Sequence, residues 1–193
     1  WNGLVSKNGV LDNGTNERRS IMKGHISKCI KRLKEWNAPL TGWRCEKVVD
    51  VREDEEDIPL GMRSPLSNCE LCDCNKVRYE HWMVNDLYFE PVIVGCICAG
   101  IMEGNIMAAK DREREIRNRQ KRRRNFVKRR WVESKKGVFI RSYRNKRIYI
   151  RKVNGFYDIR CGSEWCNRYK GKMITDMLSA SYAAFELADP RRT

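Results

Sequence analysis

The sequence lacks a long apolar run. Its longest apolar stretches, such as residues 92–99, carry Gly and Cys, and none approaches the roughly 18 apolar residues that indicate a membrane span. No secretory signal is evident at Trp1, although an initial Trp leaves open whether an upstream segment is missing. We therefore expect no membrane partner.

The sequence also lacks an even set of regularly spaced cysteines. It has nine, unevenly distributed along 193 residues, whereas a secreted disulfide scaffold is smaller and carries paired counts. We expect reduced thiols, some of them bound to metal. This predicts a cytoplasmic protein, with the nucleoid or the nucleus as alternative locations.

Signatures of catalysis are missing too. The sequence has no nucleophile motif, no phosphate-binding loop and only two histidines, so few residues are available as a general base. Glu133-Ser134-Lys135 has the E-x-K spacing of some metal-dependent nucleases, but Asp111, a carboxylate such a site would need, lies in a predicted helix. We expect no catalysis and keep a metal-dependent nuclease as the second alternative.

What the sequence has in excess is local positive charge. Residues 110–152 hold 20 Lys and Arg against 4 Asp and Glu, and the rest of the chain is nearly neutral, although the formal net charge of the whole is +15. Charge this concentrated is typical of a protein that binds a polyanion. A solvated charged helix is the alternative interpretation.

The spacing of apolar residues predicts a mixture of helices and strands. Helices are expected over residues 17–36, 101–131 and 173–188, and strands over 43–51, 77–83, 92–94, 136–143, 147–153 and 156–161. Tight hairpins are expected at residues 144–146 and at Asn154-Gly155. The expected class is α+β, with a small zinc-binding module followed by a basic helix and a βββα unit. The predicted parts are an N-terminal helix and strand (1–60), the zinc-binding module (61–104), the basic helix (105–134) and the βββα unit (135–193).

Soft metal ligands gather between residues 69 and 98, where five of the nine cysteines and one histidine lie. Cys69-x2-Cys72 can place two thiolates on one metal ion, and zinc then needs two further nitrogen or sulfur ligands. His81, Cys96 and Cys98 are candidates, because a hairpin over residues 77–94 would return them to the C-x2-C pair. An iron–sulfur cluster is the metal alternative, and reduced structural cysteines are the alternative without metal.

A knuckle, a hairpin and a helix that bears the last ligand resemble the treble-clef group of zinc fingers. The resemblance rests on C-x2-C, R-Y-x-H and V-G-C-x-C-A, within residues 69–104. The chain also resembles an uncharacterised class of bacterial and phage proteins with a C-x2-C…H…C pattern. The resemblance implies one structural zinc ion, held by Cys69, Cys72, His81 and Cys98, with Cys96 and Cys74 as alternates. His25, four residues before Cys29, is expected to be a packed or half-exposed helix residue and not a ligand or a base.

The basic segment is expected to contact backbone phosphates, because its charges lie on every side of the predicted helix. Phe126 and Trp131 interrupt the charges and are expected to dock the helix on the following sheet, with base stacking as the alternative. The candidate contact residues are Arg117, Arg119, Lys121, Arg122, Arg123, Arg124, Lys128, Arg129, Arg130, Arg141, Arg144, Lys146 and Arg147.

The element order helix, three strands, helix resembles a double-stranded RNA-binding domain, although G-K-M-I-T-D-M-L lacks the basic start of that domain's final helix. A three-stranded sheet that enters the major groove, as in some integrase arm-binding domains, fits equally well. We therefore predict a zinc-stabilised nucleic-acid-binding accessory protein, for DNA or RNA, of phage or mobile-element type. The first alternative is a protein–protein adaptor or inhibitor whose basic face covers an acidic surface of a nucleic-acid-dependent enzyme.

Overall fold

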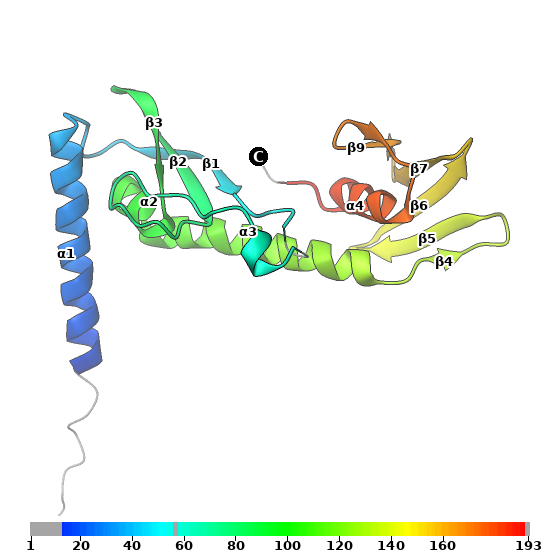
Figure 1. The fold of residues 1–193 in the computed structure, drawn as a ribbon, viewed down its shortest axis with the longest axis horizontal. Helices are drawn as coiled ribbons and strands as arrows, with labels where there is room; N and C mark the ends of the chain where they lie inside the picture. The colour runs from blue at the N-terminus through cyan, green and yellow to red at the C-terminus, as the bar shows by residue number, and fades with distance from the viewer. Residues whose placement is uncertain (1–12, 56–57, 192–193) are drawn as a thin grey trace, which may run out of the picture. The chain divides into compact units, whose positions relative to one another are not determined.

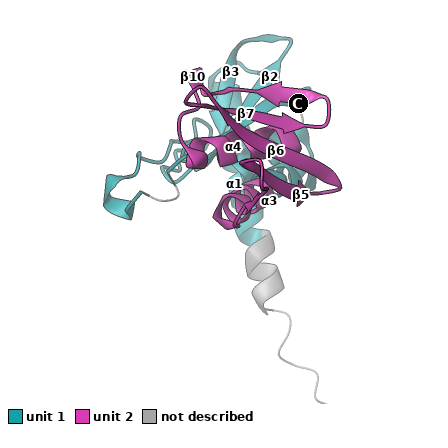
Figure 2. Cartoon of the chain, turned by 90° about the vertical axis from the view of Figure 1, so that its right-hand side faces the viewer, with its two compact units in different colours: residues 1–116 teal, residues 117–193 magenta. Residues whose placement is uncertain are grey.

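The computed structural model describes residues 13–55 and 58–191, with side chains from Ser20 onward. The chain divides into two compact units, Trp1–Ile116 (unit 1) and Arg117–Thr193 (unit 2), which Figure 2 shows in two colours. The described residues mix four α-helices with ten strands, which confirms the α+β class. The four parts expected from the sequence divide the chain more finely, and their boundaries stay predictions. Residues 1–12 of the first part lie outside the described residues.

Unit 1 contains a three-stranded antiparallel sheet. Its strands β1 (Arg44–Asp50), β2 (Tyr79–Asn85) and β3 (Tyr88–Val94) lie in the order β1-β2-β3. Helices α1 (Asn13–Glu35) and α2 (Cys96–Glu103) and the first part of α3 (Ile106–Lys128) complete the unit (Figure 1). A short 3-10 helix, η1 (Leu60–Met62), lies between β1 and β2 in the chain. The buried core of this unit includes Leu33, Trp43, Met83, Val94 and Met102, together with several cysteines.

Helices α2 and α3 are separated at Gly104, so the prediction of one continuous helix over residues 101–131 is wrong at this point. Gly104 adopts a left-handed conformation (φ 72°) and donates its N–H to the carbonyl of Ile101, which ends α2. The side chain of Asn105 accepts the N–H of Ala108 at 3.0 Å and starts α3. Gly100 allows the two helices to approach, because a Cβ there would lie 2.4 Å from the Cα of Ile106.

Unit 2 contains a five-stranded antiparallel sheet in the order β4-β5-β6-β7-β8. The strands are β4 (Val132–Glu133), β5 (Val138–Tyr143), β6 (Lys146–Val153), β7 (Phe156–Cys161) and β8 (Glu164–Cys166). Two short strands, β9 (Arg168–Tyr169) and β10 (Lys172–Met173), precede the closing helix α4 (Met177–Ala188). Ile148, Ile150 and Ile159 of the sheet share a buried core with Phe126 of α3 and Phe185 of α4.

Two-residue turns join the central strands of unit 2. Arg144 and Asn145 (φ 47° and 63°) connect β5 to β6, and Asn154 and Gly155 (φ 49° and 87°) connect β6 to β7. Two consecutive left-handed residues are typical of the type I′ turn, whose twist matches that of the flanking strands. The tight hairpins expected from the sequence at these two points are therefore present.

Candidate metal centre and nucleic-acid interface

A tight turn presents the first two cysteines of the predicted zinc module. The N–H of Cys69 bonds to the carbonyl of Cys74 at 2.8 Å, and the N–H of Asp73 bonds back to the carbonyl of Cys69 at 2.9 Å. Asp73 takes a left-handed conformation (φ 60°), which closes the turn. The N–H of Gly95 donates to the Sγ of Cys69 at 3.4 Å. The turn therefore lies against the chain between β3 and α2, which leads directly to Cys98.

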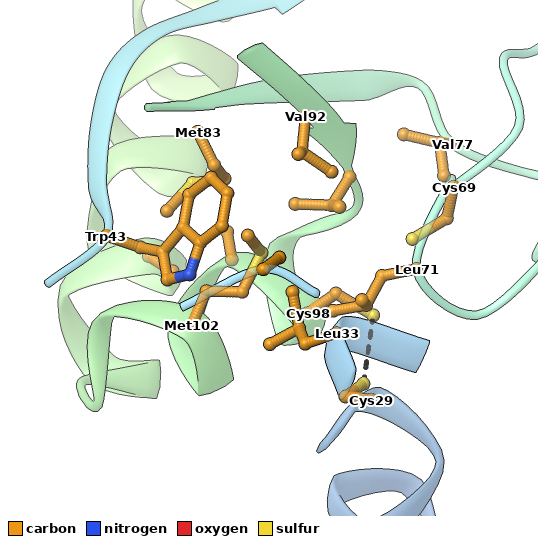
Figure 3. Packing of buried hydrophobic residues seen from close by; sticks show 14 residues of the cluster. Cys29, Leu33, Trp43, Cys69, Leu71, Val77, Met83, Val92, Cys98 and Met102 are labelled. Carbon is orange, nitrogen blue, oxygen red and sulfur yellow. Dashed lines mark hydrogen bonds between the residues drawn. The ribbon is translucent and has the colours of Figure 1, made fainter. Parts of the chain in front are cut away.

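The side chains that this turn meets come from two helices. His25 of α1, Cys72 of the turn and Cys98 of α2 each offer a ligand atom, and these three atoms lie within 4.8 Å of one another. The Nε2 of His25 is 3.3 Å from the Sγ of Cys98. Figure 3 shows Cys29 of α1 facing Cys98, with 3.7 Å between the two sulfur atoms, and Cys69 nearby. His25, Cys72 and Cys98 could together hold a metal ion, and we call these three residues the metal-capable group.

The crowding of these thiols shifts their protonation. The hydrogen bond with Cys98 lowers the pKa of Cys69 to about 5, and burial opposes this shift. The neighbouring Cys29 and Cys69 side chains raise the pKa of Cys98, and burial adds to the rise. Burial raises the pKa of Cys72 as well. Adjacent thiolates repel one another, and a bound divalent cation is the group that stabilises several of them at once.

The zinc-finger resemblance implies four ligands. Cys69, Cys72 and Cys98 lie in this part of unit 1, whereas His81 does not join them. His81 lies in β2, opposite Val48 of β1 and Val94 of β3, and is fully buried. Its Nδ1 lies 3.2 Å from the carbonyl of Tyr79, and burial lowers the pKa of its imidazole. His25, which the sequence suggested was a packed or half-exposed helix residue and not a ligand, is the histidine of the metal-capable group. The sequence signal for it was its four-residue spacing from Cys29, which puts both side chains on one helix face.

The two alternates differ from the clustered cysteines. Cys74 is exposed. Cys96 is partly buried at the start of α2, and burial raises its pKa to about 11, with the carboxylate of Glu113 adding to the rise. Neither belongs to the metal-capable group among the residues that the structure describes.

Several of the predicted nucleic-acid contacts are engaged inside unit 2. Arg119 donates to the carboxylate of Glu186 at 2.7 Å and to the carbonyl of Asp189 at 2.6 Å and 3.0 Å. Arg123 is buried, pairs with Glu186 at 3.4 Å and lies over the ring of Tyr182. Through these contacts, arginines of α3 bind α4.

Asp189, directly after α4, is the centre of this network. Its carboxylate accepts from Arg122 at 2.8 Å, from the hydroxyl of Tyr143 at 3.0 Å and from Arg144 at 3.2 Å. Burial alone would raise the pKa of Asp189, but the donors Arg122 and Tyr143, together with the nearby Arg144 charge, hold it below its ordinary value. The carboxylate is therefore ionised and paired in the folded state.

Arg141 of β5 is also structural. It donates to the carbonyl of Phe126 at 2.5 Å, and its guanidinium lies 4.8 Å from the ring centre of Phe126 and 4.2 Å from that of Trp131. Both rings are edge to face at 5.8 Å. The two aromatic residues thus pack within unit 2, as the docking hypothesis predicted. The remaining candidates expose their side chains and are Arg117, Lys121, Arg124, Lys128, Arg129, Arg130, Lys146 and Arg147.

One face of the five-stranded sheet is turned away from the core. Ile148 and Ile150 of β6 are buried on the core side, so the alternate residues of that strand lie on the other side. Strand register places Tyr149 beside Arg160 of β7, and Arg160 beside Trp165 of β8. Tyr149 is 38% exposed and Trp165 is 63% exposed. We call this surface the outer sheet face and define it by Arg147, Tyr149, Arg151, Arg160 and Trp165.

The sequence prediction missed Arg160 and Trp165 as members of this surface. The alternation in Phe156–Cys161 carried a signal for Arg160, because it lies between the buried Ile159 and Cys161. The short strand β8 was not predicted, so the sequence prediction did not place Trp165 beside Arg160 on this surface. Asp158, opposite Arg151, is the acidic residue that shares this side of β7.

The residues of the E-x-K hypothesis are not members of the metal-capable group. Glu133 is exposed in β4, and Asp111 forms an ion pair with Arg114 at 2.7 Å. Among the described residues, the one metal-capable group contains neither carboxylate.

Comparisons with protein-family models, with curated proteins and with solved structures find no match to this chain. Within residues 13–55 and 58–191, no helix has both the length and the apolar content needed to cross a membrane.

Proposed function

We propose that this chain is a nucleic-acid-binding protein in which a structural zinc ion stabilises unit 1 and the outer sheet face of unit 2 contacts the nucleic-acid backbone. One observation carries the proposal. Arginines on the core side of unit 2 have protein partners, whereas the side chains of Arg147, Arg151 and Arg160 on the outer sheet face make no hydrogen bond or ion pair with any described residue. The fold thus gathers on one surface three arginines that it does not use internally.

The charge balance of unit 2 supports a polyanionic ligand. Residues 117–193 contain 23 Lys and Arg and 6 Asp and Glu, a net charge of +17. Two of the six acidic residues, Glu186 and Asp189, are paired with arginines of unit 2. A surface with this excess attracts nucleic acid through its phosphates and releases the counterions condensed there.

The aromatic residues of the outer sheet face extend this argument beyond phosphates. Tyr149 and Trp165 lie on either side of Arg160, on neighbouring strands. Exposed aromatic rings beside arginines can stack on unpaired bases, while the guanidinium groups bind the backbone. The surface is therefore suited to DNA or RNA, and single-stranded ligands can use the rings as well as the charges.

The donor atoms of the metal-capable group favour zinc. Thiolate and imidazole ligands suit zinc, whereas magnesium and calcium prefer oxygen ligands. The separation of 3.3 Å between the Nε2 of His25 and the Sγ of Cys98 is close to the value of about 3.5 Å expected for an imidazole nitrogen and a thiolate bound to one tetrahedral zinc ion. With four protein ligands the ion would be structural, because no coordination position would remain for a substrate.

Fluorescence anisotropy with a short duplex, an RNA hairpin and a single-stranded oligonucleotide tests the nucleic-acid proposal. Replacing Arg147, Arg151 and Arg160 together by Ala should weaken binding at least tenfold at moderate salt. It should also make the log–log salt slope shallower by about two to three units, since each duplex phosphate contact contributes about 0.9. The melting temperature of unit 2 should not change, because these side chains have no internal partner.

The matched control removes the same charge from unit 1 by replacing the exposed Lys31, Lys34 and Lys76 with Ala. Binding by this variant should change less than about twofold, because its charges lie outside the proposed surface. Equal losses in the two variants would mean that net charge alone drives binding, and the assignment of the surface would be wrong. If the wild-type protein binds none of the three nucleic acids, the outer sheet face belongs to an acidic protein partner, and the adaptor alternative replaces the proposal.

A further inference from the structure

One face of helix α1 is directed at the cysteine turn. The Nζ of Lys28 donates to the carbonyl of Cys72 at 2.7 Å, and the guanidinium of Arg32 pairs with the carboxylate of Asp73 at 2.6 Å. His25 and Cys29 precede these residues by three positions each, so they lie on the same side of the helix. Polar contacts therefore already align α1 with the metal-capable group.

The distances along this face are those of ligands that share one ion. The Nε2 of His25 lies 3.3 Å from the Sγ of Cys98, and an imidazole nitrogen and a thiolate on one tetrahedral zinc ion are separated by about 3.5 Å. Cys72 completes a group whose ligand atoms lie within 4.8 Å of one another. A fourth ligand is needed, and the thiols of Cys29 and Cys69 both interact with that of Cys98.

Cys69 is the better fourth ligand. It forms the C-x2-C turn with Cys72, and its sulfur already accepts the N–H of Gly95 at 3.4 Å. Amide donors of this kind orient metal-bound thiolates and offset their charge. Cys29 lies on α1, outside this turn, and its thiol lies 3.7 Å from that of Cys98 as a hydrogen-bond neighbour.

We propose that the metal ion is held by His25, Cys69, Cys72 and Cys98, so that α1 supplies the nitrogen ligand from 73 positions upstream of Cys98. The ion then fastens α1 to the rest of unit 1. This inference rests on the proposed metal centre but not on nucleic-acid binding. Three thiolates around a divalent ion leave one negative charge, and Lys28 and Arg32 lie beside the turn to offset it.

The apolar packing of α1 is too limited to hold the helix on unit 1 without the metal ion. Of its described side chains, Cys29 and Leu33 are buried, whereas Ile21 and Ile30 are exposed. Most of the stability of a protein helix comes from packing of an apolar face. A helix with so little buried apolar surface depends on its other anchors, and the strongest available anchor is a metal–ligand bond.

Cobalt substitution tests the ligand set, because the visible spectrum of Co(II) reports how many thiolates bind the ion. The wild-type protein should give a spectrum of three sulfurs and one nitrogen. The variant His25→Cys should bind cobalt with a spectrum shifted to longer wavelength, as four sulfurs require, and His25→Ala should bind zinc at least tenfold more weakly. The control Cys29→Ala should leave spectrum and affinity unchanged.

A His25→Cys spectrum identical to that of the wild type would overturn the inference, and so would loss of one thiolate in Cys29→Ala. A wild-type protein that binds neither zinc nor cobalt would refute the metal centre itself, which is a separate result from any failure to bind nucleic acid.

Hydrogen exchange tests whether the metal ion holds α1 on the rest of unit 1. In His25→Ala with excess zinc, amides 26–35 of α1 should exchange at least tenfold faster than in the wild type, while those of β2 and β3 keep their protection. Unchanged exchange in α1 would show that the helix docks without the ion.

Discussion

Replacing Asp189 by Asn should destabilise unit 2 by about 2 to 3 kcal/mol. The substitution keeps the size of the side chain but removes the charge that Arg122, Arg144 and Tyr143 contact. Hydrogen bonds to charged groups contribute roughly 1.5–3 kcal/mol each. We discount their sum because the Arg122 and Arg144 side chains are 34% and 52% exposed, so water can solvate them in the variant.

Thermal unfolding of the full chain measures this effect. For a unit of this size, 1 kcal/mol corresponds to roughly 4–8 °C, so the transition of unit 2 should fall by roughly 10 to 20 °C. The control is Glu164→Gln, which removes one exposed negative charge from the same unit and should shift the transition by little. A shift in Asp189→Asn no larger than that of the control would refute the claim that the network holds α4 in place.

The pH dependence gives an independent check on the same residue. The pKa of Asp189 is lower in the folded state than its ordinary value, so its contribution to stability is present above the unfolded pKa, about 3.9. That contribution is lost as the pH falls through the lower, folded pKa. The wild type should therefore lose more stability between neutral pH and the acid range than Asp189→Asn does. Parallel acid-unfolding curves for the two proteins would contradict the assignment.

Three further predictions concern other parts of the chain. Gly100→Ala would place a methyl group 2.4 Å from the backbone of α3, so it should destabilise unit 1 by about 1 to 3 kcal/mol in a urea titration; an unchanged midpoint would mean that the two helices can separate freely. Cys72→Ser should abolish stoichiometric zinc in elemental analysis, whereas the exposed Cys74→Ser should retain it, and the reverse result would exclude the proposed ligand set. Replacing Tyr149 and Trp165 by Ala should weaken binding of a single-stranded oligonucleotide more than binding of a duplex, since stacking contributes roughly 1–3 kcal/mol per base; equal losses would argue against stacking.

Local signals in the sequence were sufficient for much of unit 2. Asn154-Gly155 and the break at residues 144–146 marked the two-residue turns, because few residue pairs tolerate two consecutive left-handed conformations. Alternation in Lys146–Val153 also identified a strand with one buried face. At Gly104 the same kind of signal was present, but the high helix propensity of the surrounding residues obscured it.

The sites depend on contacts that no local pattern reveals. The sequence favoured His81 as a ligand because a hairpin over residues 77–94 would return it to the C-x2-C pair. In the structure His81 is buried in β2, opposite Val48 and Val94 of the neighbouring strands. His25 reaches the cysteines through packing of a distant helix. In the same way, charge on every side of α3 concealed which arginines Glu186 and Asp189 would engage, since those partners follow 67 positions later.

The short turns of unit 2 also bear on how quickly it can form. Strands β4 to β7 each pair with the next strand in the chain, so most of their contacts are between residues close in sequence, and folding of such topologies is comparatively fast. Helix α4 comes last in the chain and joins the sheet over long separations. We therefore expect the hairpins to be formed in the transition state and the pairing of α3 arginines with α4 to follow it, so that added salt accelerates unfolding more than it slows folding.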